Sequence, residues 1–416
     1  MSDGGVPIDQ GLLSTRDAAA RLGVKPATLY AYVSRGLLHR TVAMDGRSSL
    51  FDPAELDALR RGRRDRTEGE LRTVIATAIT RVDDQGLLVR GIPLVDLVQS
   101  GMGFVEVVEH LWDAPDGESW PSTRELLVED LGESWGTDLD GLDALRVIVA
   151  LTSATDPLRH DLSPGGVRAA GRRMITTMVH GLAGAPASSR GRARPLPDVL
   201  WSHLTRRRST VDQRRVLDVA LALMVDHGMA ASTFAARIAA SVRADPYSVV
   251  SAGLGALGGP MHGAASAGVH RLIEDVERTG DAAKAIGAVL RAGERVPGFG
   301  HSVYRVQDPR YTALMAAVIE AWRDDPRLQH IFRVRDVVSE RRELLPNIDL
   351  AVGALTWLAG MTPDAGETIF AVARTAGWLA HAIEEYDEAP LRFRPRARYT
   401  GTIEPSNGDS GRRGPG

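Results

Sequence analysis

The chain has no cysteine among its 416 residues. Without thiols it forms no disulfide, thiolate metal site, iron–sulfur cluster or cysteine nucleophile, and nothing in it points to secretion. Long apolar runs are also missing: none is long enough to span a bilayer, and residues 1–10 lack the basic and apolar regions of a signal peptide. These absences predict a cytoplasmic protein that makes no membrane contact.

Lysine is almost absent too, since Lys25 and Lys284 are the only two among 50 basic residues. The formal net charge of −3 favours neither nucleic acid nor an anionic surface as a partner. Residues 14–66, however, hold eleven basic and six acidic side chains, a local charge of +5, which leaves −8 for the remainder. With 44% hydrophobic residues, a chain of this length can bury a sizeable core and is expected to hold more than one domain.

The N-terminal residues have the pattern of two short helices followed by a hairpin. Ser14 can cap a first helix, Gly23 is the residue that a helix end prefers, and Pro26 suits the first turn of a second helix. Residues 41–43 and 49–51 flank a turn and predict a short hairpin, after which a third helix begins. The spacing predicts a small winged helix-turn-helix domain over residues 1–60.

This N-terminal pattern resembles the winged helix-turn-helix domain of the MerR and excisionase group, whose second helix enters the major groove of DNA. The resemblance implies duplex DNA as a partner, with five candidate contact residues: Lys25, Thr28, Tyr30, Arg35 and Arg47. A module that docks on protein and never touches DNA would have the same pattern, so that alternative stays open. The arginine-rich residues 61–69 form a basic linker, either solvated or adding phosphate contacts.

From residue 70 to residue 403 the pattern predicts a mainly α fold, because apolar residues recur three and four apart and two-residue alternation is scarce. Residues 253–258 match the G-x-G-x-x-G motif of dinucleotide-binding proteins. No βαβ series surrounds the motif, and Pro260 interrupts the helix that should follow. We therefore expect a glycine-rich turn here, and a disordered tail over residues 404–416.

Two histidines, His262 and His301, lie in glycine-rich frames, GGPMHGAA and PGFGHSVYR. Glycine lets the backbone turn sharply and leaves an imidazole open to a ligand. No two of the eleven histidines are three or four residues apart, and no HExxH motif occurs, so we expect no metal site.

An acid and three arginines follow. Asp349 precedes an apolar helical run, where a desolvated carboxylate would act as a general base with a raised pKa; a helix cap is the alternative. Arg374 shares a helix face with two aromatic residues, and Arg310 and Arg394 add two guanidinium groups that can bind carboxylates bidentately. Together with the histidines, these residues predict a site for a di- or tricarboxylate undergoing acid–base chemistry at carbon.

From Leu71 onward, over about four-fifths of the chain, the sequence resembles citrate synthase and its 2-methylcitrate synthase relatives. The blocks GPMHG, GFGHSVYRVQDPR, PNIDLAVG, FAVARTAGWLAH and RPRARYTG occur in the family's order and close to its spacing. The resemblance implies a large helical domain and a smaller one, roughly residues 264–361, that closes over the substrate. It also implies a homodimer in which Arg394 reaches the neighbour's site.

The same resemblance implies a role for each residue. Asp349 would remove a methyl proton from acetyl-CoA, neutral His262 would stabilise the enolate, and His301 would polarise the ketone of oxaloacetate and protonate it. Four residues would bind the carboxylates of oxaloacetate: His227, Arg310, Arg374 and Arg394. Arg305 would contact CoA. The products would be citrate, or 2-methylcitrate from propionyl-CoA, and CoA, with no cofactor beyond the acyl-CoA substrate.

The sequence departs from the family pattern beside three of these residues. Gly228 and Ala230 stand where Glu and Asn are usual, Ser266 stands where Asn is usual, and Ser302 where bacterial members have Arg. Such departures bear on substrate and turnover more than on fold. Three hypotheses follow: a synthase with a DNA-binding-like headpiece, a DNA-binding regulator that uses the body as a ligand sensor with little turnover, and a protein with both activities. The intact Asp349 favours a synthase.

Overall fold

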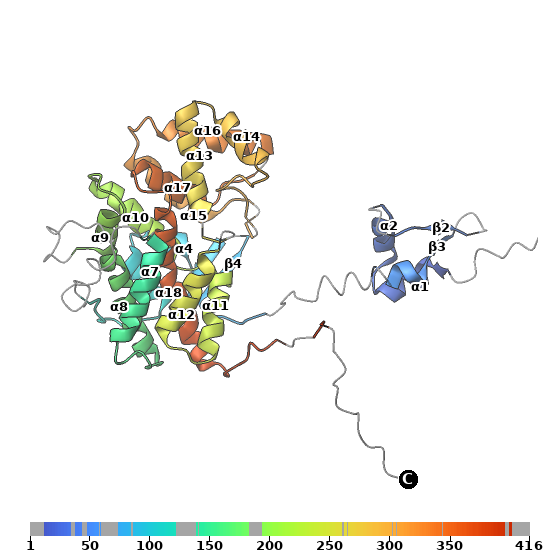
Figure 1. The fold of residues 1–416 in the computed structure, drawn as a ribbon, viewed down its shortest axis with the longest axis horizontal. Helices are drawn as coiled ribbons and strands as arrows, with labels where there is room; N and C mark the ends of the chain where they lie inside the picture. The colour runs from blue at the N-terminus through green and yellow to red at the C-terminus, as the bar shows by residue number, and fades with distance from the viewer. Residues whose placement is uncertain are drawn as a thin grey trace, which may run out of the picture. The chain divides into compact units, whose positions relative to one another are not determined.

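The computed structural model describes residues 12–34, 38–43, 48–57, 59, 74–84, 86–121, 139, 141–182, 194–259, 262–263, 265–301, 303–304, 306–342, 344–395 and 399–401. The chain divides into two compact units, Met1–Ala76 and Thr77–Gly416 (Figure 1). The expected linker at residues 61–69 and the expected tail at residues 404–416 lie outside the described residues.

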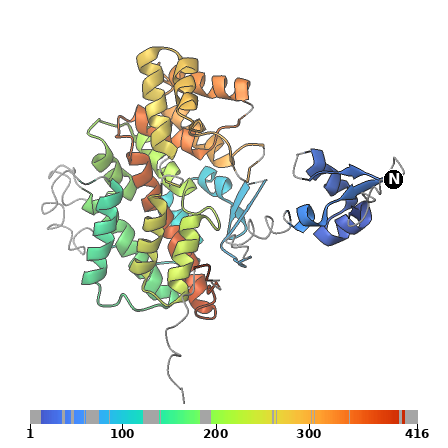
Figure 2. The same cartoon turned by 45° about the vertical axis from the view of Figure 1, so that its right-hand side comes forward.

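In the residues that the structure describes, the N-terminal unit is built from short helices and short strands (Figure 2). These elements are β1 (Leu13–Ser14), α1 (Thr15–Leu22), α2 (Pro26–Ser34), β2 (Thr41–Val42) and β3 (Ser49–Phe51). The Ser14 hydroxyl accepts the Asp17 N–H at 3.3 Å, and Gly23 ends α1 with a φ of 65°, a left-handed conformation that favours glycine. The first two predicted helices and the β2–β3 hairpin are confirmed, and residues 53–57, where the third helix was predicted to begin, are helical. Strand β1, which pairs with β3, was not predicted.

A small core holds the N-terminal unit together. Leu29 from α2, Phe51 from β3 and Leu56 from the helical residues 53–57 are almost completely buried and pack on the alanine face of α1. Two surface contacts join residues 53–57 to the rest of the unit: the ion pair of Arg21 with Asp57 at 2.6 Å, and a hydrogen bond between the His39 ring and Glu55 at 2.8 Å. The unit therefore has an apolar core of its own.

The larger unit is mainly α-helical, as predicted, and begins with a small antiparallel sheet in the order β4–β5–β6. The strands are β4 (Thr80–Asp83), β5 (Gly86–Val89) and β6 (Ile92–Pro93). The helices are α4 (Leu94–Gln99), α5 (Phe104–Leu111), α7 (Gly141–Thr155), α8 (Pro164–Gly181), α9 (Leu196–Leu204), α10 (Val211–Leu223), α11 (Ala231–Ser241), α12 (Pro246–Leu257), α13 (Ala265–Thr279), α14 (Ala282–Arg291), α15 (Pro309–Ala321), α16 (Leu328–Arg342), α17 (Ile348–Leu358) and α18 (Ala365–Asp387). Within the described ranges, no helix is long and apolar enough to cross a membrane. The sheet was not predicted, because strands of two to four residues are too short to show a period of two.

Helix α18 is the centre of this unit, packed against α7, α8, α11 and α12 (Figure 1). Most of its side chains are fully buried, including Trp378. Gly253 of α12 lies so close to Trp378 that a Cβ atom there would be 2.5 Å from the indole ring. The expected glycine-rich turn over residues 253–258 is therefore wrong for its first five residues, which are helical: the glycine permits close helix packing.

A second, smaller hydrophobic cluster lies among α13, α14 and α16, which gather at one end of the unit (Figure 1). Its members include Leu272, Val276, Ile286, Val334 and Val338. Helix α17 packs on α13 and α15 and begins with Asp349 in its first turn. A closing subdomain over residues 264–361 stays a prediction.

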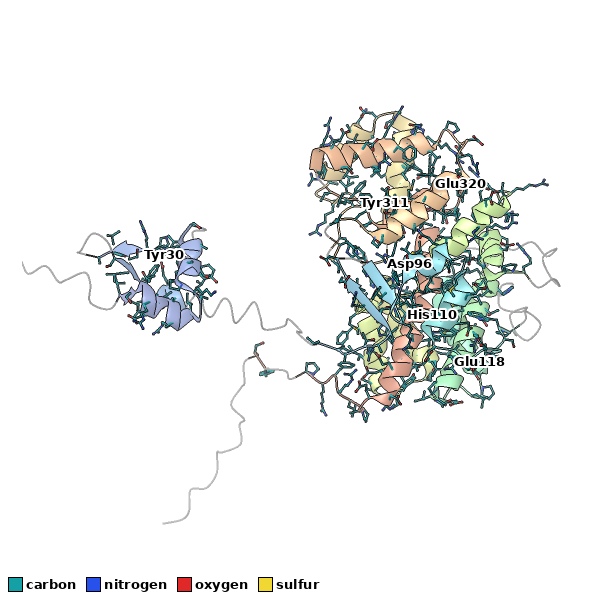
Figure 3. All side chains as sticks on the ribbon, turned by 180° about the vertical axis from the view of Figure 1, so that it is seen from behind. Tyr30, Asp96, His110, Glu118, Tyr311 and Glu320 are labelled. Atoms are coloured by element: carbon teal, nitrogen blue, oxygen red, sulfur yellow. The ribbon has the colours of Figure 1, made fainter. Side chains whose placement is uncertain are left out.

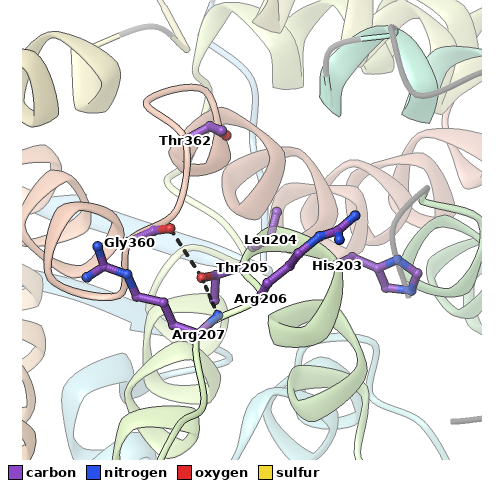
Figure 4. Close-up of a pocket in the computed structure, with 7 residues that line it drawn as sticks. All are labelled: His203, Leu204, Thr205, Arg206, Arg207, Gly360 and Thr362. Carbon is purple, nitrogen blue, oxygen red and sulfur yellow. Dashed lines mark hydrogen bonds between the residues drawn. The ribbon is translucent and has the colours of Figure 1, made fainter. Parts of the chain in front are cut away.

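The turn from α17 to α18 is fastened to the segment that follows α9 (Figure 4). The Thr205 hydroxyl lies 3.1 Å from the Ala359 carbonyl and 3.2 Å from the Gly360 carbonyl, and it accepts the Arg207 N–H at 3.1 Å. A surface pocket at this junction is lined by His203, Leu204, Thr205, Arg206, Arg207, Gly360 and Thr362, none of which is a predicted site residue. These contacts therefore fasten the C-terminal end of α17, the end opposite Asp349.

Candidate active site

His301 sits in a loop whose geometry selects one ring tautomer. Gly298 and Gly300 have φ values of 81° and 80°, so the backbone turns sharply on both sides of Phe299, as the glycine frame predicted. The backbone N–H groups of Val303 and Tyr304 both donate to His301 Nδ1, at 3.0 and 3.1 Å. Nδ1 is therefore an acceptor, and the ring proton of the neutral imidazole is on Nε2.

Burial lowers the pKa of His301, and the nearby Arg310 guanidinium lowers it further. At neutral pH the ring is thus an uncharged donor through Nε2–H. Such a group can polarise a carbonyl oxygen and then give it a proton.

His262 lies in a tight turn after α12. Its backbone N–H donates to the Gly259 carbonyl at 2.9 Å, and the Gly263 N–H donates to the Leu257 carbonyl at 3.1 Å. The ring nitrogen Nε2 lies 2.8 Å from the hydroxyl of Ser232, a fully buried residue in the first turn of α11. Burial lowers the pKa of His262, with Arg374 adding to the effect. Ser232 was not predicted as a functional residue, although it lies only five residues after His227.

Asp349 lies in the first turn of α17, but it is not the helix cap. Asn347 takes that place: its side chain accepts the Asp349 N–H at 3.0 Å and donates to the Gly300 carbonyl at 2.8 Å. Burial raises the pKa of Asp349 from 3.8 to about 6; Asp308 also raises it, whereas Arg310 and Arg374 act in the opposite direction. The cap alternative is wrong, and Asp349 is a carboxylate poised to exchange a proton near neutral pH.

Two buried arginines face this acid. Arg310, at the start of α15, pairs with both oxygens of Asp308 at 3.0 and 2.9 Å, and Asp308 also accepts the Ile348 N–H at 3.1 Å. Arg374 in α18 donates through Nε to the Met224 carbonyl at 3.0 Å, and its Cζ lies 4.4 Å from the centre of the Phe370 ring. Burial lowers the pKa of Arg374 to about 10. An arginine buried this deeply is suited to binding an anion.

His227 joins the group from the loop between α10 and α11. Its Nε2 lies 3.1 Å from the Tyr304 hydroxyl, and its ring centre is 5.2 Å from that of His301. Burial lowers the pKa of His227, followed by Arg310 and Arg374, so the ring is neutral. Tyr304 was not predicted as a functional residue either.

Two departures from the family pattern, Gly228 and Ala230, lie in the loop that holds His227. The buried Asp226 carboxylate accepts the Thr80 hydroxyl at 2.6 Å and the Gly228 N–H at 2.9 Å. Gly228 has a φ of 60°, and a Cβ atom there would be 3.0 Å from a Val82 methyl group, so glycine fits and a larger residue would be strained. Ala230 is the N-cap residue of α11 and provides no capping side chain.

Six of the eight predicted substrate and catalytic residues come together in this unit: His227, His262, His301, Arg310, Asp349 and Arg374. Arg305 lies outside the described residues. Arg394 is exposed beyond α18 and makes no contact with the group that the structure describes. The backbone before it is held, because Leu391 donates to the Ser241 carbonyl at 2.9 Å and Phe393 packs on Phe234 with ring centres 5.4 Å apart. Over the described ranges, no three His, Asp or Glu side chains form a group that could hold a metal ion.

Three of the five predicted DNA-contact residues can be placed. Lys25 precedes α2 and is exposed, Thr28 is half-buried, and Tyr30 is 43% exposed (Figure 3). The Tyr30 hydroxyl lies 3.4 Å from that of Thr15, which ties α2 to the start of α1. Arg35 and Arg47 lie outside the described residues.

Comparison with known proteins identifies both units. The family described as "Citrate synthase, C-terminal domain" matches residues 70–396, and a "Helix-turn-helix domain" model matches residues 12–64. The citrate synthase of Haloferax volcanii is 41% identical over 188 residues, which are 44% of this chain and 49% of that protein, and citrate synthase 2 of Bacillus subtilis is 38% identical over 44% and 50% of the two chains. The chain thus spans about half the length of these two relatives. The 2-methylcitrate synthase 1 of Corynebacterium glutamicum is 28% identical over 79% of this chain and 93% of its own.

Solved structures show the same fold. The citrate synthase of Thermoplasma acidophilum, solved in a ternary complex with carboxymethyl coenzyme A and oxaloacetate, has a TM-score of 0.67 at 22% identity and covers 82% of this chain and 97% of its own. The citrate synthase of Thermotoga maritima has a TM-score of 0.64 at 24% identity, with coverages of 81% and 96%. The chain therefore belongs to the citrate synthase family and carries a helix-turn-helix domain ahead of its citrate synthase domain.

Proposed function

We propose that the protein is a cytoplasmic enzyme that condenses oxaloacetate with acetyl-CoA or propionyl-CoA, giving citrate or 2-methylcitrate and free CoA. The observation that carries this proposal is Asp349, whose pKa burial raises to about 6, facing two buried arginines and accompanied by three neutral histidines. A carboxylate with this pKa is ionised at pH 7 and is a stronger base than an ordinary aspartate. The arginines supply binding for a substrate that carries two carboxylates.

The first step forms an enolate. The Asp349 carboxylate takes a proton from the carbon next to the thioester carbonyl, and His262 stabilises the negative charge that develops on the thioester oxygen. When the Ser232 hydroxyl donates to His262 Nε2, the ring proton lies on Nδ1, which then donates to that oxygen.

The second step makes the carbon–carbon bond. The enolate carbon attacks the ketone carbon of oxaloacetate, and the ketone oxygen takes the proton of His301 Nε2. Arg310, Arg374 and His227 hold the carboxylates of oxaloacetate during this step. Water then hydrolyses the citryl thioester and releases CoA, which makes the reaction irreversible. The cycle closes when Asp349 gives up the proton it took and His301 regains one on Nε2.

We also propose that the enzyme is a homodimer whose partner supplies Arg394. The segment before Arg394 is fastened to α11 and α18 while Arg394 itself is exposed, which suits a residue that serves a neighbouring site. Two apolar side chains nearby are also exposed: Ile238 of α11 is 42% exposed, and Val242, the C-cap residue of this helix, is 54% exposed. Arg394→Ala and Asp349→Asn subunits, each inactive alone, are expected to regain activity when mixed, because a mixed dimer has one intact site. No recovery in dimers shown to have exchanged subunits would refute the shared site.

The test of the main proposal is CoA release by the purified protein with oxaloacetate and each acyl-CoA, beside Asp349→Asn. Release that depends on Asp349 supports the synthase. The donor that reacts faster shows the acyl preference, which has to be measured because one methylene changes binding by only about 1–3 kcal/mol. No release with either donor from a protein that still binds oxaloacetate refutes condensation.

A second candidate is a DNA-binding regulator that uses the citrate synthase domain as a ligand sensor with little turnover. The helix-turn-helix match over residues 12–64 and the exposed Lys25 and Tyr30 at α2 favour it. Fluorescence anisotropy with duplex DNA at several salt concentrations tests it, because removing one phosphate-binding side chain lowers the salt slope by about one. Arg35→Ala with Arg47→Ala is expected to reduce the slope. An unchanged slope would exclude both residues from phosphate contact. Both activities in one protein would establish the bifunctional hypothesis.

A further inference from the structure

The side chain of Tyr304 contacts three groups that the proposed function assigns to oxaloacetate. Its hydroxyl lies 3.1 Å from His227 Nε2. Its ring stacks on that of His301, with centres 4.4 Å apart and planes inclined by 30°. The Arg310 guanidinium carbon lies 5.7 Å from the centre of the same ring. The Tyr304 backbone N–H in addition donates to His301 Nδ1 at 3.1 Å.

The chemical state of this tyrosine suits a structural hydrogen bond. Tyr304 is 5% exposed, and burial raises its pKa to about 12, so the phenol keeps its proton at neutral pH. His227 is neutral because burial lowers its pKa, and a neutral imidazole nitrogen is a strong acceptor. A phenol that donates to Nε2 places the His227 ring proton on Nδ1 and fixes the rotation of the ring.

We infer that Tyr304 is a positioning residue of the oxaloacetate site, whose hydroxyl orients His227 and whose ring supports His301 by stacking. This inference rests on the proposed function, because it concerns how the same site holds its dicarboxylate substrate. Loss of the hydroxyl would leave a buried imidazole nitrogen without its partner and the ring free to turn. The ring stacking on His301 would remain.

Tyr304→Phe removes the hydroxyl alone and is the direct test. We expect KM for oxaloacetate to rise about 5- to 30-fold, the effect of one lost buried hydrogen bond. We expect kcat and KM for the acyl-CoA to stay within about twofold, because the hydroxyl bonds to His227 and not to the groups proposed to form the enolate. Tyr386→Phe is the matched control: it deletes a hydroxyl that donates to the Ala244 carbonyl at 2.6 Å, far along α18 from Arg374.

A second readout reports on His227 directly. In ¹⁵N-histidine-labelled protein, the ring-nitrogen resonances of His227 are assigned by their loss in His227→Asn. Tyr304→Phe is expected to shift these resonances, whereas Tyr386→Phe is expected to leave them unchanged. A general loss of stability would not move these resonances selectively. Equal changes in both KM values, the same changes in Tyr386→Phe, or unmoved His227 resonances would overturn the inference.

Calorimetric titration with oxaloacetate separates the two proposals. If the wild type binds oxaloacetate without releasing CoA, condensation is refuted. A rise of about 5- to 30-fold in the Kd for oxaloacetate in Tyr304→Phe still supports the positioning role in that case. A Kd within twofold of the wild type overturns that role whether or not the protein turns over.

Discussion

Asp349→Asn is expected to stop catalysis and at the same time to stabilise the fold. The substitution is nearly isosteric, and the helix cap at Asn347 stays in place. Removing a general base typically costs about 10²- to 10⁴-fold in rate. Oxaloacetate binding should be unchanged or tighter, because the variant removes a negative charge near Arg310 and Arg374 while keeping both guanidinium groups.

The stability effect follows from the raised pKa. At 1.36 kcal/mol per pH unit, a displacement from 3.8 to about 6 corresponds to about 3 kcal/mol. The folded state binds this proton more tightly than the unfolded state, so the group favours folding below pH 4 and this contribution is lost as the pH rises to about 6. Because the side chain is partly exposed, we expect Asp349→Asn to raise the free energy of unfolding at pH 7 by about 1–3 kcal/mol.

Urea unfolding at pH 7 and pH 4, together with CoA release, measures both effects on the same samples. The stability gain should be present at pH 7 and should shrink at pH 4, where the wild-type carboxyl is largely protonated. A variant that is less stable than the wild type at pH 7 would refute the desolvation of the Asp349 carboxylate. Unchanged turnover would remove Asp349 from the mechanism.

Four further outcomes are expected. The value of kcat/KM should fall tenfold per pH unit below about pH 6 and level off above it, since the Asp349 carboxylate must be ionised; a flat profile in a pH series would contradict this. Ser232→Ala should lower kcat by about 10- to 100-fold, with KM for oxaloacetate unchanged in steady-state kinetics, because His262 loses its partner. Gly253→Ala should destabilise the protein by about 1–3 kcal/mol in urea unfolding because its methyl group meets the Trp378 ring, whereas Gly255→Ala, with nothing within 4 Å, should not. Ala230→Asn should stabilise α11 by about 1 kcal/mol in the same assay, and no gain would mean that another group already satisfies the helix end.

Local signals in the sequence were sufficient wherever a residue and its immediate neighbours determine the structure. Ser14, Gly23 and Pro26 mark the ends of α1 and α2 because capping and turn preferences act within a few residues. His301 was recognisable because Gly298 and Gly300 beside it take left-handed conformations. The exclusion of Asp349 as the helix cap, in contrast, needed the structure, since the sequence alone does not show that Asn347, two residues earlier, takes that place.

Contacts between distant residues left no such signal. Ser232 lies 30 residues before His262 and meets it because α11 packs against α12. Tyr304 lies 77 residues after His227 and meets it where α10 and α15 pack together. At Gly253 a sequence signal was present but did not reveal the tertiary contact. The G-x-G-x-x-G motif is typical of dinucleotide-binding proteins, whereas this glycine is needed because the Trp378 indole ring lies where a Cβ atom would be. A glycine that serves helix packing and one that serves a phosphate are identical in sequence. The two kinds of glycine differ in what packs against them in the folded protein, a side chain or a ligand. The functional assignment of such residues therefore depends on tertiary contacts.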